Sequence, residues 1–389
     1  MSGVVNVCPV CRVQHKIVRK VFMNLPRYDY LQVGAPTKKV KMRHSNSEIS
    51  LPEFDRPVSI VENFKRVAQR DKPYWVPNPL TDIQYFSPTD HISAVLAVMG
   101  CKEDTRFQDW FGADWTFVVS AGGPMLTPEI QIMDDVTQWE KKVKFPDINK
   151  WDFKTKADDF VKNTYDPEKA LCMDIGLGCT ERLVSVMGGY TDSMLALAME
   201  PEACADFFQA FTDWQIAHFD KLFEHYPYIS MLTYHDDWGN EKDTFFSPAM
   251  LENMVLPQTK RFFDHVKSKG IAIEFHNCGN ISRFLPQIAN ELSPEFMQIQ
   301  RRVLDFPAIK LQYGDKLGFC GGIEGFNVNS DDPPKDELIE MVRNTVDALG
   351  KGGGLYIGLG MGGLKTPEAL WYATNELYAY SSEMYAKER

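Results

Sequence analysis

Three segments of the sequence combine carboxylate, imidazole and thiol side chains, and each of them follows a short apolar run. They are Tyr234-His235-Asp236-Asp237-Trp238-Gly239, His276-Asn277-Cys278-Gly279-Asn280 and Phe319-Cys320-Gly321-Gly322-Ile323-Glu324. These side-chain types transfer protons and bind transition metals. We therefore take the three segments as parts of one candidate site.

His276 and Cys278 form the sharpest pair of candidate ligands. Residues two apart on an extended strand end point to the same side, so both can face one ion. Cys320 follows a strand two further along by our count, and it is the candidate third ligand. Zinc takes such nitrogen and sulfur ligands, and a catalytic zinc keeps one position open. The alternative is that the cysteines are small core residues and that His276 caps the next helix.

Acidic and aromatic candidates lie near the same strand ends. Asp236 and Asp237 follow a strand, and we expect at least one of them to contact substrate, donate a proton or bind the metal. Strand alternation cannot be phased here, so Asp236 is only slightly favoured over Asp237, and a helix N-cap is the alternative role. Glu181 and Tyr190 follow another strand end and are weaker candidates, for which helix or surface roles compete.

The elements that must position these residues follow an alternating pattern from about residue 61. Short apolar runs end in polar or glycine-containing tips, and an amphipathic stretch follows each of them. This pattern predicts an α/β fold with parallel strands, a (β/α)8 TIM barrel whose reacting groups lie at the C-terminal strand ends. Seven strands are predicted, one short of a closed barrel: Tyr74–Pro77, Ala170–Leu177, Ser230–Tyr234, Ile271–Phe275, Phe296–Ile299, Leu317–Gly321 and Gly354–Leu359.

Residues 1–55 differ from the rest and are predicted to form an N-terminal extension, with the barrel over residues 56–389. They lack helical periodicity and contain Cys8-Pro9-Val10-Cys11 followed by His15. This spacing is found in zinc knuckles, but the chain has no second Cys-x-x-Cys pair to complete four ligands. The role of Cys8 and Cys11 stays open.

Composition excludes several classes of partner. The chain has 389 residues, 44% hydrophobic residues and a net charge of −11, so a phosphate backbone would be repelled and nucleic acid is not expected. No apolar run is long enough to span a membrane, and the N-terminus lacks a signal-peptide pattern. Eight sparse cysteines favour a reducing compartment, so we expect a cytoplasmic protein. The oligomeric state stays open, a homodimer included.

The segment His276-Asn277-Cys278-Gly279 resembles the His-x-Cys-Gly motif of corrinoid and coenzyme M methyltransferases in the uroporphyrinogen decarboxylase-like superfamily. The resemblance runs from about residue 60 to the end through further landmarks: Asp236-Asp237-Trp238-Gly239, Phe246-Ser247-Pro248, Met254-Val255-Leu256-Pro257, the glycine-rich 352–363 and Thr366-Pro367-Glu368. It implies a (β/α)8 barrel with zinc at its C-terminal mouth, bound by His276 and Cys278. It also implies a methyltransferase that exchanges methyl groups with cobalamin carried on a partner protein.

One departure from this resemblance changes the expected ligand set. The coenzyme M branch places a further thiolate in the last glycine-rich tip, where this chain has Met361. Because a thioether is a weak zinc ligand, Cys320 takes the third-ligand role in our prediction. A separation of about forty residues between two cysteines is similar to that of the branch that demethylates methoxylated aromatic compounds. We therefore expect a small methylated substrate and O-demethylation.

Two other functions compete with this one. A porphyrinogen decarboxylase fits less well, because its N-terminal arginine-rich motif is not recognisable and Met361 replaces its C-terminal histidine. A non-catalytic module that binds a corrinoid protein is the second alternative, and the two thiols and imidazole on separate tips argue against it. The chain also lacks an Asp-x-His-x-x-Gly segment of the kind that ligates cobalt in carrier proteins, so the corrinoid is expected on a partner.

Overall fold

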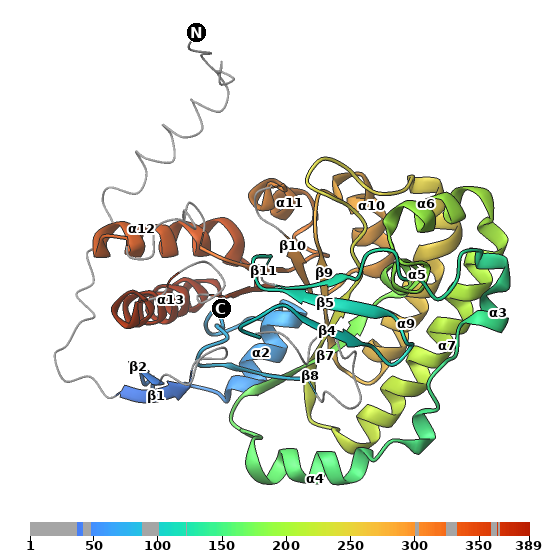
Figure 1. Ribbon diagram of the computed structural model, residues 1–389. Coiled ribbons are helices and arrows are strands. Elements are labelled where there is room, and N and C mark those ends of the chain that lie inside the picture. The colour runs from blue at the N-terminus through green and yellow to red at the C-terminus, as the bar shows by residue number, and fades with distance from the viewer. Residues whose placement is uncertain are drawn as a thin grey trace. The chain divides into compact units, whose positions relative to one another are not determined.

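The computed structural model describes residues 37–41, 48–87, 101–121, 123–299, 303–323, 333–358, 364 and 366–389. Thr37–Arg389 form one compact unit, drawn in Figure 1. Cys8, Cys11, His15, Glu324 and Met361 lie outside the described residues. Within the described part of the chain, no helix is long and apolar enough to cross a membrane.

A curled parallel sheet of seven strands forms the centre of this unit, and it confirms the predicted (β/α)8 TIM-barrel-like fold. The strands lie in the order β12-β11-β10-β9-β8-β7-β3, so each strand from β7 onward pairs with the next one along the chain. Their bounds are β3 Ile83–Phe86, β7 Ala170–Leu177, β8 Ile229–His235, β9 Ala272–Asn277, β10 Phe296–Ile299, β11 Phe319–Gly321 and β12 Leu355–Ile357.

Six of the seven predicted strands match this sheet, and the first one does not. The predicted strand Tyr74–Pro77 is irregular, and the strand that pairs with β7 is β3. Prolines at 73, 77 and 79 remove the N–H donors that a strand in this place would need. The carbonyl of Pro77 still accepts a hydrogen bond from the Ile357 N–H of β12, at 3.0 Å. The segment 74–86 therefore contacts both β12 and β7.

Helices cover the outside of the sheet (Figure 1). The longer ones are α2 Ile60–Gln69, α4 Phe153–Asn163, α5 Cys179–Met187, α6 Tyr190–Met199, α7 Pro201–His225, α9 Leu256–Ser268, α11 Phe306–Tyr313, α12 Lys335–Thr345 and α13 Pro367–Glu388; shorter helices are α3 Trp139–Lys142, α8 Pro248–Met250 and α10 Leu285–Gln287. Outward residues of the strands, such as Leu171, Leu232 and Phe275, pack in the main core cluster. Successive strand residues point to opposite faces, so their neighbours point inward.

The inward residues form a separate cluster inside the barrel. Phe64, Val67 and Ala68 of α2 pack there on the inward side chains of Ile83, Ala170, Cys172, Met231, Ala272, Phe296, Cys320 and Tyr356. Further along β9 the inward positions become polar, with buried Glu274 and then His276. The apolar layer thus closes one end of the barrel and leaves the polar groups at the C-terminal strand ends.

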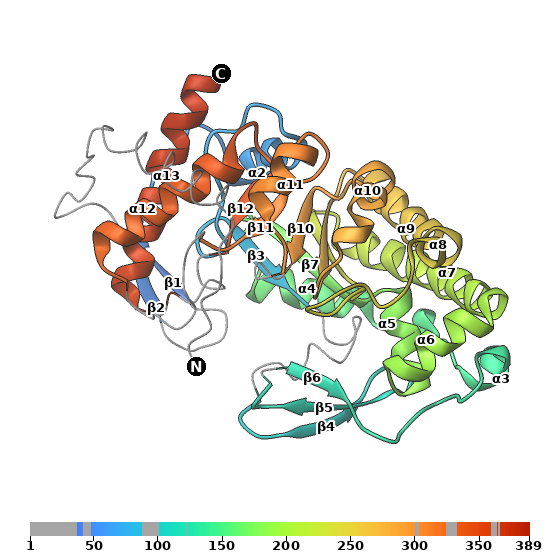
Figure 2. The ribbon, with the colours of Figure 1, turned by 90° about the horizontal axis from the view of Figure 1, so that it is seen from above.

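An antiparallel sheet is inserted between β3 and β7. Its strands are β4 Thr105–Gln108, β5 Asp114–Val118 and β6 Gly123–Leu126, shown in Figure 2. Asp109, just after β4, pairs with Arg182 of α5 at 2.6 Å, and both side chains are buried. The Arg182 guanidinium also lies 4.1 Å from the Phe111 ring centroid. This ion pair anchors the insert to the helix that follows β7.

Part of the predicted N-terminal extension packs with the barrel. β1 (Thr37–Lys41) and β2 (Glu48–Pro52) pair as an antiparallel hairpin. β2 contacts α13, and Leu51 is fully buried in the main core. Phe54 then stacks on Tyr378 of α13, with ring centroids 4.0 Å apart. Among the described residues, packing with the barrel thus includes the hairpin and continues into α2.

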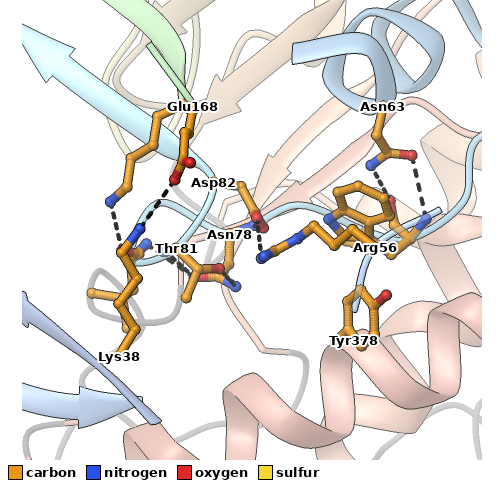
Figure 3. A network of polar contacts seen from close by, with 12 residues as sticks. Lys38, Arg56, Asn63, Asn78, Thr81, Asp82, Glu168 and Tyr378 are labelled. Atoms are coloured by element: carbon orange, nitrogen blue, oxygen red, sulfur yellow. Dashed lines mark hydrogen bonds and ion pairs between the residues drawn. The ribbon is translucent and has the colours of Figure 1, made fainter. Parts of the chain in front are cut away.

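A buried ion pair between Arg56 and Asp82 links this region to the turn before β3 (Figure 3). Asp82 is 1% exposed, and its carboxylate accepts from Arg56 Nη2 at 2.8 Å and from the Asn78 N–H at 3.0 Å. The Arg56 guanidinium lies within 6 Å of three aromatic rings, those of Phe54, Trp75 and Tyr378. By contrast, Lys38 and Glu168 form an exposed pair at 3.4 Å.

We predict that Arg56→Met lowers the free energy of unfolding by about 3–5 kcal/mol, because it leaves the buried Asp82 carboxylate without its ion-pair partner. The matched control is Lys38→Met in the exposed pair, which should change stability by less than about 1 kcal/mol. Urea unfolding of the full-length chain, followed by circular dichroism, measures both. Equal losses for the two variants would contradict this assignment.

Candidate functional site

Asp237, His276 and Cys278 lie together at the C-terminal ends of β8 and β9. One ligand atom from each lies within 4.8 Å of the other two. Cys278 Sγ is 3.4 Å from His276 Nε2, and this nitrogen is 3.9 Å from Asp237 Oδ1. Ligands about 2.0–2.3 Å from a tetrahedral zinc ion stand about 3.3–3.8 Å apart. The three side chains therefore have the spacing of a metal site.

The junction between β8 and β9 sets this arrangement. The last in-register pair is His235 with His276, and the Asp236 N–H then donates to the His276 carbonyl at 3.2 Å. Beyond the strand ends, side chains continue the pairing. Asn277 Nδ2 donates to the Asp236 carbonyl at 2.5 Å, and the Cys278 N–H donates to Asp237 Oδ1 at 2.5 Å. These bonds hold the Asp237 carboxylate against the histidine and the cysteine.

Two glycines allow the loops after β8 and β9 to approach each other. A Cβ on Gly279 would lie 2.4 Å from the Gly239 carbonyl oxygen, and the φ angle of Gly279 is +85°. A Cβ on Gly239 would lie 2.7 Å from the Asn280 carbonyl oxygen. Asn280 N–H donates to the Asn240 carbonyl at 2.6 Å between the same loops. The loops after β8 and β9 thus both need glycine, at Gly239 and Gly279, for steric reasons.

The two adjacent aspartates play different parts. Asp236 is fully buried and accepts from the Glu181 N–H and Trp238 Nε1, each at 2.9 Å, and from the Thr180 hydroxyl. It thus caps α5, an earlier helix and not the segment that follows, and Gly178 at the helix start leaves room for it. Burial raises the pKa of Asp236 to about 6, against these hydrogen bonds. Of the two, Asp237 faces the metal-ligand group.

His276 is held by a residue that the sequence analysis did not identify. Its Nδ1 lies 2.5 Å from Gln298 Oε1 on β10, and Gln298 Nε2 donates to Cys320 Sγ at 3.5 Å. Cys320 does lie two strands beyond β9, as expected, but Gln298 lies between. The structure does not bring Cys320 into the group of Asp237, His276 and Cys278. The only sequence signal for Gln298 is its place on a predicted strand. Its contacts with His276 and Cys320 follow from the strand register, which the sequence does not reveal.

A second histidine, His235, lies next to the group and contributes to the lowered pKa of His276. His235 Nε2 lies 2.9 Å from Asp174 Oδ2, and its ring centroid is 4.5 Å from that of His276. Burial lowers the pKa of His235, but the charge and hydrogen bond of Asp174 outweigh burial and raise it to about 9. Burial, and then the charge of His235, lower the pKa of His276 to about 4. His276 is therefore neutral at pH 7, the state that binds metals.

The weaker candidates Glu181 and Tyr190 also lie close to this group. Burial, and then the charges of Asp237 and Asp236, raise the pKa of Glu181 well above its ordinary value. Burial and the charges of Glu181 and Asp237 likewise raise the pKa of Tyr190. The Tyr190 ring lies 4.5 Å from that of Phe245, which follows β8. An acid and two aromatic rings thus neighbour the metal-ligand group.

Comparisons with known proteins agree with this fold. The family model described as uroporphyrinogen decarboxylase (URO-D) matches residues 107–368. A solved structure of a methyltransferase from Methanosarcina mazei is similar, with 12% identity and a TM-score of 0.57. The match covers 84% of this chain and 99% of the methyltransferase chain. A provisionally assigned vitamin-B12-independent methionine synthase from Listeria monocytogenes is also 12% identical. That match covers 59% of this chain and 69% of the synthase chain, and its TM-score of 0.37 is too low to support an inference. No curated protein matches significantly.

We predict that Asp236→Ala lowers the free energy of unfolding by about 3 kcal/mol or more, because it leaves buried donors of Thr180, Glu181 and Trp238 without their acceptor. Asp237→Ala is the matched control, and we expect it to cost less than about 1.5 kcal/mol because the Asp237 side chain is 20% exposed and accepts one backbone bond. Urea unfolding with a chelator present measures both. A larger loss for Asp237→Ala would reverse the two roles.

Proposed function

The chain belongs to the uroporphyrinogen decarboxylase family, and on this basis we propose that it is a zinc-dependent methyltransferase. It would move a methyl group between a small methylated substrate and a corrinoid carried on a partner protein. The observation that supports this most is the grouping of Asp237, His276 and Cys278 within 4.8 Å at the C-terminal strand ends. This is the end at which barrel enzymes place their chemistry.

The donor set fits zinc. Zinc binds imidazole nitrogen, thiolate sulfur and carboxylate oxygen, and three protein ligands leave a fourth position for substrate. One thiolate, one carboxylate and one neutral imidazole would make the occupied site formally neutral. Asp237 thus replaces Cys320 as the third ligand in our proposal. When bound, the ion would act as a Lewis acid toward the oxygen or sulfur from which the methyl group leaves.

The neighbouring residues would orient the substrate. Burial and nearby carboxylates raise the pKa of Glu181 and of Tyr190, which favours the protonated form of both groups. Each can therefore donate a hydrogen bond to a substrate at the metal-ligand group. Burial, and then the charge of the neighbouring His235, lower the pKa of His276 and favour its neutral form, while Asp174 pairs with His235.

The substrate class that we propose is a methoxylated aromatic compound, which would undergo O-demethylation. The neighbouring rings of Tyr190 and Phe245, tilted by 36° with centroids 4.5 Å apart, offer an aromatic surface on which a substrate ring can pack. The Methanosarcina neighbour, described as a methyltransferase, is in keeping with this type of reaction. The corrinoid would arrive on a separate protein, since the chain has no cobalt-ligating carrier motif.

The charges near the group do not favour the decarboxylase alternative. A porphyrinogen with eight carboxylates requires arginines or lysines around it. Among the described residues, the cations that lower the pKa of Glu181 are His235, which is paired with Asp174, and Arg182, which is paired with Asp109. A non-catalytic corrinoid-binding module would have no need of the grouped ligands.

We predict that the purified chain binds one zinc ion and that His276→Ala and Cys278→Ala each abolish binding, because each removes one of three ligands. Both variants should stay folded by circular dichroism. Cys101→Ser is the matched control for loss of a thiol, and it should keep the metal. Metal analysis after dialysis measures the content, and full zinc retention by either site variant would contradict the ligand set.

We predict that the zinc-loaded chain methylates reduced cobalamin on a carrier protein when a methoxylated aromatic compound is supplied. The change in corrinoid absorbance from cob(I)alamin to methylcobalamin measures the transfer, and Cys278→Ala should reduce it to background. Parallel incubation with uroporphyrinogen tests the alternative. Carbon dioxide release there, without methyl transfer from any donor, would favour decarboxylation.

A further inference from the structure

One layer of inward side chains crosses three neighbouring strands beside the metal-ligand group. Gln298 of β10 pairs in register with His276 of β9. The pairing of Met297 with Phe319 then places Gln298 beside Cys320 of β11. Gln298 is half-buried and Cys320 is buried. His276, Gln298 and Cys320 thus form a continuous row, and only the first of them touches the other candidate ligands.

The two ends of the Gln298 amide are chemically different, and their orientation decides which ring nitrogen of neutral His276 carries the hydrogen. The amide nitrogen only donates and the oxygen only accepts. In the structure Nε2 donates to Cys320 Sγ at 3.5 Å, and Oε1 faces His276 Nδ1 at 2.5 Å. The hydrogen of the neutral imidazole must then lie on Nδ1. Nε2 keeps its lone pair and faces Cys278 Sγ at 3.4 Å.

The opposite amide orientation would disable the site. An amide N–H pointing at His276 would require Nδ1 to accept, and the imidazole hydrogen would move to Nε2. A protonated Nε2 cannot bind a metal ion. The amide orientation therefore selects the ligand form of His276. The Cys320 sulfur accepts from the amide in the observed orientation and so supports it.

We propose that Gln298 is the positioning residue of the metal centre, fixing the tautomer and the ring orientation of His276, and that Cys320 acts through Gln298 and not as a ligand. This inference rests on the proposed function, because it requires that His276 binds a metal ion. It also gives Cys320 a part in the site without contact to the ion.

The expected magnitudes follow from the two bonds. Removing the hydrogen-bond partner of a metal-binding histidine lowers metal affinity by about 10–100-fold. The bond to Cys320 is longer and involves sulfur, which is a weak acceptor. Loss of Cys320 should therefore weaken metal binding less than loss of the Gln298 acceptor.

Titration of cobalt(II) alone into the full-length chain tests the proposal. Gln298→Met keeps the side-chain length and removes both hydrogen bonds, and it should weaken binding about 10–100-fold. Gln298→Glu keeps an acceptor for His276 Nδ1 and should restore the affinity. Circular dichroism and urea midpoints check that each variant folds.

The thiolate-to-cobalt absorption band provides a second readout, since its intensity reflects the number of bound thiolates. The wild type should show one thiolate, Cys320→Ser should keep the band, and Cys278→Ser should lose it. Wild-type affinity in Gln298→Met, or a halved band in Cys320→Ser, would overturn the proposal. If the wild type binds neither cobalt nor zinc, the metal centre of the proposed function fails with it.

Discussion

The site depends on how the ends of β8 and β9 are joined beyond their last paired residues. Asn277 bonds to the Asp236 carbonyl, and the Cys278 N–H bonds to the Asp237 carboxylate. The loops that follow touch backbone to backbone at Gly239 and Gly279, where a Cβ would clash. A shift of either loop would separate Asp237 from His276 and Cys278. The grouped ligands are therefore a consequence of this junction.

Buried charges are compensated one by one around this junction. The Asp236 carboxylate accepts hydrogen bonds from the first turn of α5 and from the Trp238 indole, so it links α5 to the loop after β8. Asp174 pairs with His235, and burial together with the charge of His235 lowers the pKa of His276. Arg182 is held by Asp109 of the inserted sheet. The site thus keeps an acceptor imidazole, a thiol and a carboxylate close together.

Much of the fold could be predicted from the sequence, because six strands are apolar runs that end in polar tips. The strand at Tyr74–Pro77 was wrong, since the prolines there remove the donors of a sheet and β3 lies further on. Within the site, alternation along β9 predicted that His276 and Cys278 share a side, and they do. It could not separate Asp236 from Asp237, because capping of α5 is a long-range contact. Gln298 was missed because only strand register places it between His276 and Cys320.

X-ray absorption at the zinc edge of the zinc-loaded, full-length chain tests the central claim most directly. Zinc–sulfur distances near 2.3 Å and zinc–nitrogen or zinc–oxygen distances near 2.0–2.2 Å are distinguishable by this method. A centre formed by Asp237, His276 and Cys278 predicts one sulfur neighbour, with all other neighbours nitrogen or oxygen. Two sulfur neighbours would return Cys320 or another thiol to the ligand set, and no sulfur neighbour would contradict the centre altogether.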